Sequence, residues 1–433
     1  MRWASTWLVL SCVLAPRVAA AQDTSVTVRI GMTYNPLVPP GISVLPVLGP
    51  NGDSIHAIIQ RDLVNSDRFN VVPLDSADPR AYRDSTTAGG LNYPMFRALN
   101  VHRVVQMTMT PTGVHVALHD VDSAWVAVPK DFVLPLPALG RDWRFSLHVI
   151  ADAIVEWITG QRGIAATRIA YVANGSVRVV DSDGAGDIAV AAEPNASSPA
   201  WSPDGKAIVY STYGTNARIL SVTLATGRSQ AIVPFQADET LLGPHYSPTG
   251  DSVVYFRDDG NVSALWTVSA TGAGSRKIVS GLPGVNASLS FSPDGRRIAF
   301  TSGRAGVPEV YIMDADGTNP KMLTSALRID ANTYNSDPSW SPDGLRIAFQ
   351  SRINGLFQLM AIKVQDYSAK QLTDAGQNVH PSWAPDSRHL VFQSDRSGAE
   401  QLWVLDYESG TVRQLTHGSA GPKLAAWSPR LQP

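Results

Sequence analysis

Hydrophobic and polar positions alternate with a period of two over most of the chain beyond residue 167, and the alternation recurs in blocks. The clearest block covers residues 338–373, where PSWSPDG, LRIAFQS, LFQLMAIKV and AKQLT are separated by polar or glycine-containing turns. Alternation over four to eight residues is typical of β-strands that bury one face. Each block therefore predicts four short strands, which we denote A to D.

An aromatic residue followed by a version of Ser-Pro-Asp-Gly ends strand A of every block. WSPDG occurs at residues 201–205 and 340–344, and YSPTG, FSPDG, WAPDS and a truncated WSP occupy the equivalent positions. The aromatic residues follow one another at intervals of 45, 45, 49, 43 and 44 residues, and they are Trp201, Tyr246, Phe291, Trp340, Trp383 and Trp427. Repeats of this length with four strands each predict the blades of a β-propeller.

The A strands are offset relative to the B and C strands, although each type occurs six times. The repeat region opens with a B strand at Arg168–Ala173, and its sixth A strand is the terminal segment 425–428. Pairing of these two segments would complete the first blade and leave no unpaired inner edge. The sequence therefore predicts a closed six-bladed propeller over residues 168–433.

The recurrent Ser-Pro-Asp-Gly segment is suited to a tight turn between strands A and B. Proline presets φ at the second position, serine and aspartate bond back to nearby backbone, and glycine adopts a conformation that is costly for other residues. We interpret the repeated aspartates as structural rather than catalytic. The preceding aromatic residue is expected to wedge between adjacent blades.

A different pattern over residues 22–160 predicts a small α/β domain. Ile55, Ile58, Ile59 and Leu63 share one face of a helix, and a second apolar helical face ends at Gly160. Residues 161–167 are expected to link the two domains. The expected elements are strands at 26–31 and 42–47, a helix at 53–65, a hairpin at 102–110 and 114–121, and a helix at 141–158.

The first 21 residues have the features of a cleavable secretory signal peptide. A basic residue precedes a short apolar run, and small residues follow at Ala19-Ala20-Ala21. The run is too short to span a bilayer comfortably. We therefore expect a periplasmic protein without direct membrane insertion. The only cysteine, Cys12, lies in this segment, and the short apolar run before it argues against the alternative of a lipid-modified cysteine.

Composition and the absence of known catalytic motifs argue against several classes of function. The chain of 433 residues is 44% hydrophobic and 17% charged with a formal net charge of −2, so bulk electrostatics give no reason to expect binding to nucleic acid. The G-x-S-x-G nucleophile turn and glycine-rich phosphate loops are absent from the sequence. His115 and His119 lack the glutamate of a zinc-binding HExxH helix and lie in a strand pattern.

Two Asp-x-Asp-Gly segments, at residues 181–184 and 314–317, resemble the start of a calcium loop but fall at C–D turns. Neither has the closing glutamate of an EF-hand, so we favour turns over metal sites. No coherent set of catalytic, cofactor-binding or metal-binding residues emerges from the sequence. This result favours a binding role over an enzymatic one.

The connections from strand D to strand A vary in length, and variable loops on a rigid scaffold are common recognition surfaces. In an up-and-down blade these connections lie on the face opposite the Ser-Pro-Asp-Gly turns. We therefore expect a partner to bind on that face, at the mouth of the central channel. The candidate residues near the start of strand A are His245, Asn286, Asp337, His380 and Lys423.

The ordered combination of signal peptide, small α/β domain and six WSPDG-type blades ending in AWSP resembles the TolB family, the periplasmic component of the Tol-Pal envelope system. Further similar stretches are VRI at residues 28–30, ISVLPV at 42–47, DLVNSDRFNVV at 62–72 and ITGQRGIAATRIAYV at 158–172. The resemblance covers essentially the whole mature chain. It implies a monomeric protein without enzymatic activity or cofactor.

The resemblance also implies two partners and a cellular role. The peptidoglycan-associated lipoprotein Pal would bind at the propeller mouth, and TolA would bind a mobile N-terminal segment, residues 22–34. This system supports outer-membrane integrity and its invagination during cell division. The segment keeps VRI but departs from the family around it. Its candidate contact residues are Asp23, Thr24, Val26, Val28, Arg29 and Ile30.

Two alternatives remain open from the sequence. One is a secreted propeller hydrolase or lactonase with a metal in the channel, to which Asn286, Asp337 and His380 could contribute ligands. Metal analysis of the purified protein would favour or disfavour this class. The other is a propeller that binds sugar or peptidoglycan, which would be retained on cell-wall material in the absence of Pal.

Overall fold

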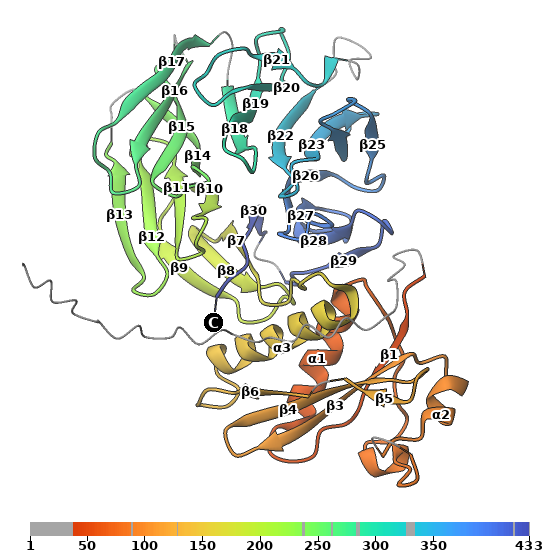
Figure 1. The fold of residues 1–433 in the computed structure, drawn as a ribbon. Helices are drawn as coiled ribbons and strands as arrows, with labels where there is room; N and C mark the ends of the chain where they lie inside the picture. Colours follow the sequence, from red (N-terminus) through yellow and green to blue (C-terminus); the bar gives the residue numbers. More distant parts are fainter. Residues whose placement is uncertain are drawn as a thin grey trace, which may run out of the picture.

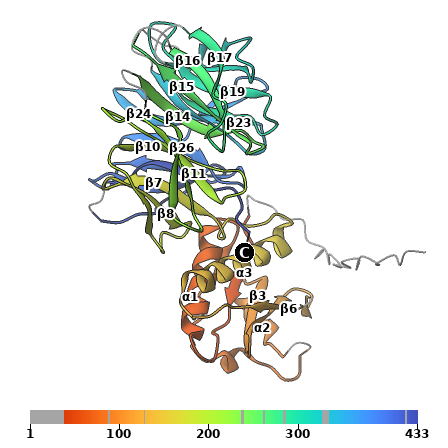
Figure 2. The same cartoon turned by 90° about the vertical axis from the view of Figure 1, so that its left-hand side faces the viewer.

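The computed structural model describes residues 38–87, 90–127, 129–235, 239–260, 263–282, 286–325, 334–418 and 421–432. It consists of an N-terminal α/β domain and a C-terminal β-propeller that lie against each other (Figures 1 and 2). The expected signal peptide, the strand at 26–31 and the segment 22–34 lie outside the described residues. Among the described helices, none combines the length and the apolar character needed to cross a membrane.

The N-terminal domain is built on one mixed sheet with the strand order β2-β1-β3-β4-β5, in which β6 also pairs with β4. Strand β1 runs parallel to β2 and β3, and β3 and β4 form an antiparallel hairpin. The strands are β1 (Gly41–Val44), β2 (Asn70–Val71), β3 (Arg103–Thr110), β4 (Gly113–Asp120), β5 (Trp125–Val126) and β6 (Lys130–Val133). The helices are α1 (Gly52–Asn65), η1 (Pro79–Tyr82), α2 (Tyr93–Ala98) and α3 (Arg141–Thr159).

Helices α1 and α3 lie between this sheet and the propeller (Figure 1). Ile55, Ile59 and Leu63 of α1 are completely buried, because residues four apart lie on one helical face. They pack in one core with Leu147 of α3 and with apolar residues of the sheet. Gly160 ends α3 in a left-handed conformation with φ 74°. Both helices were predicted at these positions.

The short elements of this domain were not predicted. Strands β2, β5 and β6 contain two to four residues, and α2 contains six. Segments this short contain less than two periods of a helix, so their hydrophobic pattern is uninformative. The strand expected at 42–47 is shorter than predicted, since β1 ends at Val44. Pro46, two residues later, has no N–H to donate to a neighbouring strand.

The propeller has six four-stranded blades, which confirms the predicted number. We number them in chain order. Blade 1 combines β30 (Lys423–Trp427), β7 (Arg168–Ala173), β8 (Ser176–Asp181) and β9 (Ile188–Ala192). Blades 2 and 3 contain β10 (Ala196–Trp201), β11 (Ala207–Thr212), β12 (Ile219–Thr223) and β13 (Arg228–Val233), then β14 (Thr240–Tyr246), β15 (Ser252–Asp258), β16 (Ser263–Ser269) and β17 (Arg276–Leu282).

Blades 4 to 6 repeat the same antiparallel order. Blade 4 contains β18 (Asn286–Phe291), β19 (Arg297–Ser302), β20 (Glu309–Asp314) and β21 (Lys321–Met322). Blade 5 contains β22 (Asn335–Trp340), β23 (Arg346–Ile353), β24 (Leu356–Lys363) and β25 (Ala369–Gln371). Blade 6 contains β26 (Asn378–Trp383), β27 (His389–Ser394), β28 (Gln401–Asp406) and β29 (Val412–Gln414).

The terminal strand β30 pairs antiparallel with β7, which is the ring closure that the sequence predicted. Trp427 is 6% exposed and its indole Nε1 donates a hydrogen bond to Thr167 Oγ1 at 2.8 Å. The backbone N–H of Ser428 bonds to the carbonyl oxygen of Arg168 at 2.8 Å. The chain therefore closes the propeller by joining residues about 260 positions apart in sequence.

The Ser-Pro-Asp-Gly turns use their side chains as the sequence predicted. In the turn of blade 2, Asp204 Oδ1 accepts hydrogen bonds from Ser202 Oγ at 2.6 Å and from the N–H of Lys206 at 3.0 Å. Gly205 follows with φ 70°. Asp294 and Asp343 make the same two kinds of bond in blades 4 and 5. These aspartates stabilise turns.

Candidate partner-binding site at the mouth of the propeller channel

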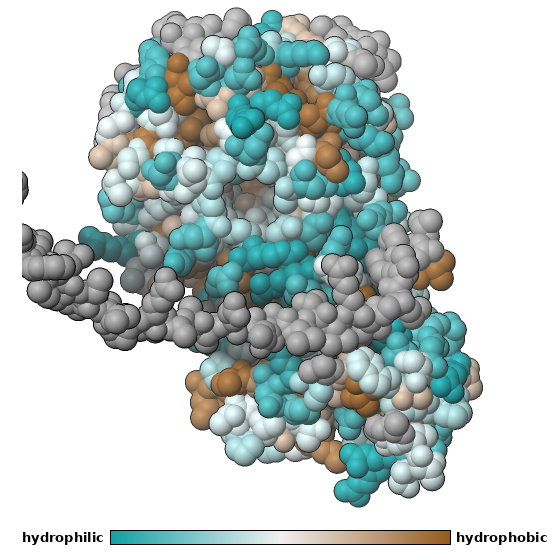
Figure 3. All heavy atoms as spheres, viewed as in Figure 1, coloured by the Kyte–Doolittle hydropathy of each residue, from teal (hydrophilic) through white to brown (hydrophobic). Residues whose placement is uncertain are grey.

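The six innermost strands, one from each blade, surround a common centre (Figure 1), and the propeller is hollowed there (Figure 3). Each of these strands contains a register shift against its neighbour in the blade. At the shift, the residue three positions before the repeat aromatic has a positive φ, between 43° and 56°, in every blade. These residues, which we call the inner ring, are Ser198, Gly243, Ser288, Asp337, His380 and Leu424.

Three consecutive members of the inner ring are joined by polar contacts. Ser288 Oγ of blade 4 donates a hydrogen bond to Asp337 Oδ1 of blade 5. Asp337 Oδ2 in turn lies 3.1 Å from His380 Nδ1 of blade 6. The other three members, Ser198, Gly243 and Leu424, carry no charge. The inner ring is therefore polar and charged on one half and neutral on the other.

The backbone of the charged half is held by the preceding blade. The N–H of Asp337 donates to Thr301 Oγ1 at 3.0 Å, and the N–H of His380 donates to Gln350 Oε1 at 3.0 Å. Gln350 is oriented by a second bond, from its Nε2 to Ser336 Oγ at 2.8 Å. A backbone held in this way loses little conformational freedom when a partner binds.

The electrostatic environment keeps Asp337 and His380 as an ion pair. Burial opposes the charged form of Asp337, but the contacts with His380 and Ser288 outweigh burial and lower the pKa of this carboxyl. Burial likewise opposes the charged imidazole of His380, but the contact with Asp337 outweighs burial and raises the pKa of this histidine. Glu400 adds to the increase, and Lys423 opposes it. The side chain of His380 is 31% exposed, so its charge is accessible from solvent.

The order of these three residues differs from that of a nucleophilic triad. In such a triad the histidine lies between serine and carboxylate, so that it can accept the serine proton. Here the carboxylate of Asp337 lies between Ser288 and His380, and both neighbours bond to it. The histidine is therefore not placed to act as the base for Ser288. The arrangement offers oriented, charged groups for binding.

The other predicted residues lie in different environments. Lys423 is exposed at the start of β30, beside Leu424 of the inner ring, and its charge acts on His380. His245 is half-buried in β14, and its ring lies 6.4 Å from that of Phe291 in blade 4. Burial lowers the pKa of His245, which favours a neutral imidazole. The structure thus brings Asp337, His380 and Lys423 together and places His245 between two blades.

Asn286 is completely buried at the start of β18. The equivalent residues of blades 5 and 6 are Asn335 and Asn378, which are also completely buried. Asn378 Nδ2 bonds to Gln358 Oε1 at 2.8 Å, and Asn335 Nδ2 bonds to Glu309 Oε2 at 2.7 Å. In blades 5 and 6 the asparagine at this position therefore connects its strand A to strand C of the preceding blade.

Sequence reasoning missed Ser288 and the inner ring as a set. The signal was present, because the ring members recur with the same intervals as the repeat aromatics, three positions earlier. It was hidden by the variety of side chains at this position, which include leucine and histidine. Residue type alone does not report a left-handed backbone unless the residue is glycine, asparagine or aspartate.

A second cluster of titratable groups lies where the two domains meet. Asp62, His148 and Asp183 bring one ligand atom each within 4.8 Å of one another, the only such group of three among the described residues. The guanidinium groups of Arg61 and Arg144 both bond to Asp183 Oδ2. Because these cations already occupy that oxygen and balance its charge, we assign the cluster to an ion-pair network. The loop 181–184 is a C–D turn, as predicted, but it also contacts the N-terminal domain.

Comparison with known proteins gives one family and several similar structures. The family model described as TolB beta propeller domain matches residues 155–431. The crystal structure of TolB from Acinetobacter baumannii is 23% identical, with a TM-score of 0.77 over 90% of this chain and 97% of that chain. The putative TolB from Agrobacterium tumefaciens is 22% identical, with a TM-score of 0.48 over 57% of this chain and 88% of that chain.

A chain of the nidogen/laminin complex is 11% identical, with a TM-score of 0.50 over 61% of this chain and 100% of that chain. At these identities the similarity of structure shows the fold. The family model covers residues of all six blades, and its match extends over more than half of the chain. This protein belongs to the TolB β-propeller family.

Proposed function

We propose that this protein is a non-enzymatic binding component of the Tol-Pal system, and that it binds Pal at the mouth of its propeller channel. The observation that carries this proposal is the charged half of the inner ring. Ser288, Asp337 and His380 come from three blades, and Asp337 bonds to both of the other two side chains. Binding sites whose groups are already fixed pay less entropy on association.

The position of the charged half also supports the proposal. The inner-ring residues precede the Ser-Pro-Asp-Gly turns, so they lie toward the D–A end of each inner strand. The contacts with the N-terminal domain involve Asp386, His389 and the loop 181–184, which are in or beside A–B and C–D turns. The N-terminal domain therefore docks at the opposite ends of the strands. His380, with Lys423 nearby, provides a partly exposed cationic region for acceptor groups of a protein partner.

The second interaction that we propose is with TolA, through residues 22–34. The support is the resemblance of the VRI stretch, and the contact residues in this proposal are Asp23, Thr24, Val26, Val28, Arg29 and Ile30. Export by the signal peptide, residues 1–21, would place the monomeric protein in the periplasm. Together the two interactions would support outer-membrane integrity and its invagination during cell division.

Capture from an envelope extract tests both interactions at once. The mature chain should retain Pal and TolA, and a chain lacking residues 22–28 should retain Pal alone. His380→Gln should lose Pal and keep TolA, because it removes the cation that is paired with Asp337 at the mouth. His115→Gln is the matched control, since His115 is an exposed histidine of the N-terminal domain. Capture of neither protein by the mature chain would overturn the proposed function.

A further inference from the structure

The corner after helix α1 is bound by the A–B turn of blade 6. Asp67 Oδ2 lies 3.1 Å from His389 Nε2, and the carbonyl oxygen of Asp67 accepts a hydrogen bond from the Arg388 guanidinium at 2.7 Å. The other ring nitrogen of His389, Nδ1, lies 2.8 Å from Asp386 Oδ2. His389 is completely buried. One histidine therefore bridges a carboxylate of the propeller and a carboxylate of the N-terminal domain.

A second histidine bridge joins the two domains, and here the histidine belongs to the N-terminal domain. His148 of α3 is 1% exposed, and its Nδ1 lies 2.6 Å from Asp62 Oδ2 of α1. Its Nε2 faces two carboxylates of the propeller, Asp183 Oδ2 at 3.8 Å and Asp181 Oδ2 at 4.0 Å. Each domain thus supplies one histidine that is paired with a carboxylate of its own domain. Each also supplies an acidic group to the histidine of the other domain.

The sequence shows why blade 6 forms the first bridge. Its turn is WAPDS, in which Ala384 replaces the serine that binds the turn aspartate in blades 2, 4 and 5. Asp386 therefore lacks that hydroxyl partner, and its Oδ2 binds His389. The residue at the position of His389 is Ala207 in blade 2 and Arg346 in blade 5. The turn that departs from the repeat is the one that contacts the other domain.

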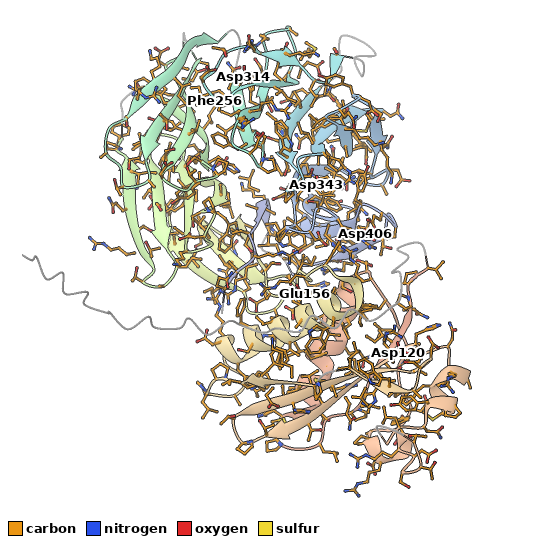
Figure 4. All side chains as sticks on the ribbon, viewed as in Figure 1. Asp120, Glu156, Phe256, Asp314, Asp343 and Asp406 are labelled. Atoms are coloured by element: carbon orange, nitrogen blue, oxygen red, sulfur yellow. The ribbon has the colours of Figure 1, made fainter. Side chains whose placement is uncertain are left out.

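Arginine side chains lie close to the carboxylates around both histidines and offset their negative charge. Around His389, Arg388 binds Asp406 at 2.6 Å and Glu408 at 2.8 Å, and Arg68 lies 3.8 Å from Asp386. Figure 4 shows Asp406 on the part of the propeller nearest the N-terminal domain. The charged groups around His148 are Asp62, Asp181, Asp183, Arg61, Arg144, Arg168 and Arg413. Arginine does not deprotonate in proteins, so the histidines are the cations that can be titrated.

The carboxylates keep both histidines charged despite their burial. Burial alone would lower the pKa of His389, but Asp386 and Asp67 outweigh it and raise that pKa to about 9. Burial also opposes the charge on His148, and Asp62, Asp183 and Asp181 together raise its pKa. A neutral imidazole would leave one carboxylate of each bridge without its cation, which is costly in a buried site.

We propose that the two histidines form a proton-dependent clasp between the domains, which holds the N-terminal domain on the propeller while both imidazoles are charged and loosens when they lose their protons. Apolar contacts of Phe145 with the propeller core and the linker remain in either state. The clasp would make the orientation of the domains sensitive to pH. It does not depend on which partners the propeller mouth binds.

The sign of the effect follows from linkage. Docking brings a carboxylate of the other domain to each histidine, so the docked form has the higher pKa and binds protons more tightly. The charged histidines therefore stabilise the docked form fully at pH values below the histidine pKa of the released form. The equilibrium constant for docking falls as pH rises toward the histidine pKa of the docked form, by up to roughly tenfold per pH unit for each histidine. For His389 the window ends at about pH 9.

Inter-domain distances measured by pulsed electron resonance between two spin labels test the clasp. The only cysteine of the sequence is Cys12, so a mature chain starting at residue 22 has none, and the changes Thr112→Cys and Ser397→Cys give unique attachment sites. Both positions are exposed, one in each domain. We expect a single narrow distance at pH 6.5 and a second population that grows as pH approaches 9.5.

Matched variants identify the groups responsible. His148→Gln combined with His389→Gln should show the second population already at pH 6.5 and no further change with pH. Asp67→Asn, which removes only the carboxylate of the other domain, should lower the pKa of His389 measured by proton NMR. Asp75→Asn, at an exposed acid of the same domain, should leave this pKa unchanged. An unchanged distance from pH 6.5 to 9.5 in the wild type, or equal pKa values in both variants, would overturn the proposal.

Discussion

Asp337 and His380 occupy the same left-handed position in the inner strands of neighbouring blades, and their side chains meet at 3.1 Å between Oδ2 and Nδ1. The repeat that builds the propeller thus also aligns two charged groups at its centre. Ser288, at the same position one blade earlier, extends the contact to a third strand. The inner ring is where the scaffold and the proposed binding site coincide.

Ring closure by the terminal strand should dominate the stability of the propeller. Trp427→Ala removes a side chain that is 6% exposed and bonds to Thr167, so we expect a loss of about 3 to 5 kcal/mol in the free energy of unfolding. Urea denaturation followed by tryptophan fluorescence measures it. Trp125→Ala, at a residue 45% exposed, is the control and should cost less than about 1 kcal/mol. Equal losses for both variants would refute the proposed importance of closure.

The neutral half of the inner ring is tightly packed at Gly243. This residue has φ 55°, and a Cβ atom there would lie 3.1 Å from the backbone nitrogen of Ser288. We expect Gly243→Ala to lower the free energy of unfolding by about 2 to 3 kcal/mol, from backbone strain and from displacement of Ser288. Gly175→Ala, with φ 67° and open space around it, should cost only the strain of about 1 kcal/mol. Chemical denaturation of the two variants side by side provides the test, and indistinguishable values would contradict it.

A buried histidine should make the N-terminal domain sensitive to acid. His119 bonds to Tyr93 at 3.0 Å and to Gln106 at 2.9 Å, and burial lowers its pKa from 6.5 to about 4. The folded state therefore binds fewer protons than the unfolded state between these values. Stability is present above pH 6.5 and is lost as pH falls toward 4, by roughly 3 kcal/mol from this group.

The variant His119→Gln isolates this effect, because glutamine keeps hydrogen-bonding groups and does not titrate. Its stability should change less than that of the wild type between pH 7 and pH 4.5 in urea denaturation. His115→Gln, at a side chain 39% exposed, should follow the wild type. The same acid-induced loss in the wild type and in His119→Gln would show that His119 is not responsible.

Much of the fold could be predicted because its signals are local. Asp204 and Gly205 exemplify a turn whose chemistry is complete within five residues, and the recurrence of this motif in the sequence marks the blades. The closing pair of strands, β30 and β7, was predictable although distant, since the repeat region opens with a B strand and ends with an A strand. Helix α3 was recognised from the spacing of its buried apolar residues.

The contacts that give the candidate site its character were less predictable. Asp337 and His380 were both selected from the sequence, but their pairing depends on the curvature of the ring. The bridge between Asp67 and His389 joins residues 322 positions apart, and no local pattern encodes it. The departure of WAPDS from the repeat marked the site of that bridge, yet a single altered copy does not reveal its partner.

Isothermal titration of purified, lipid-free Pal into the mature protein at pH 7 tests the central claim most directly. Asp337→Asn removes the charge that holds Ser288 and His380, so its Kd for Pal should rise at least about tenfold, equivalent to about 1.4 kcal/mol. Asp366→Asn, at an exposed acid of a C–D turn, should bind like the wild type. Wild-type protein that does not bind Pal, or Asp337→Asn that binds with unchanged affinity, would contradict the account.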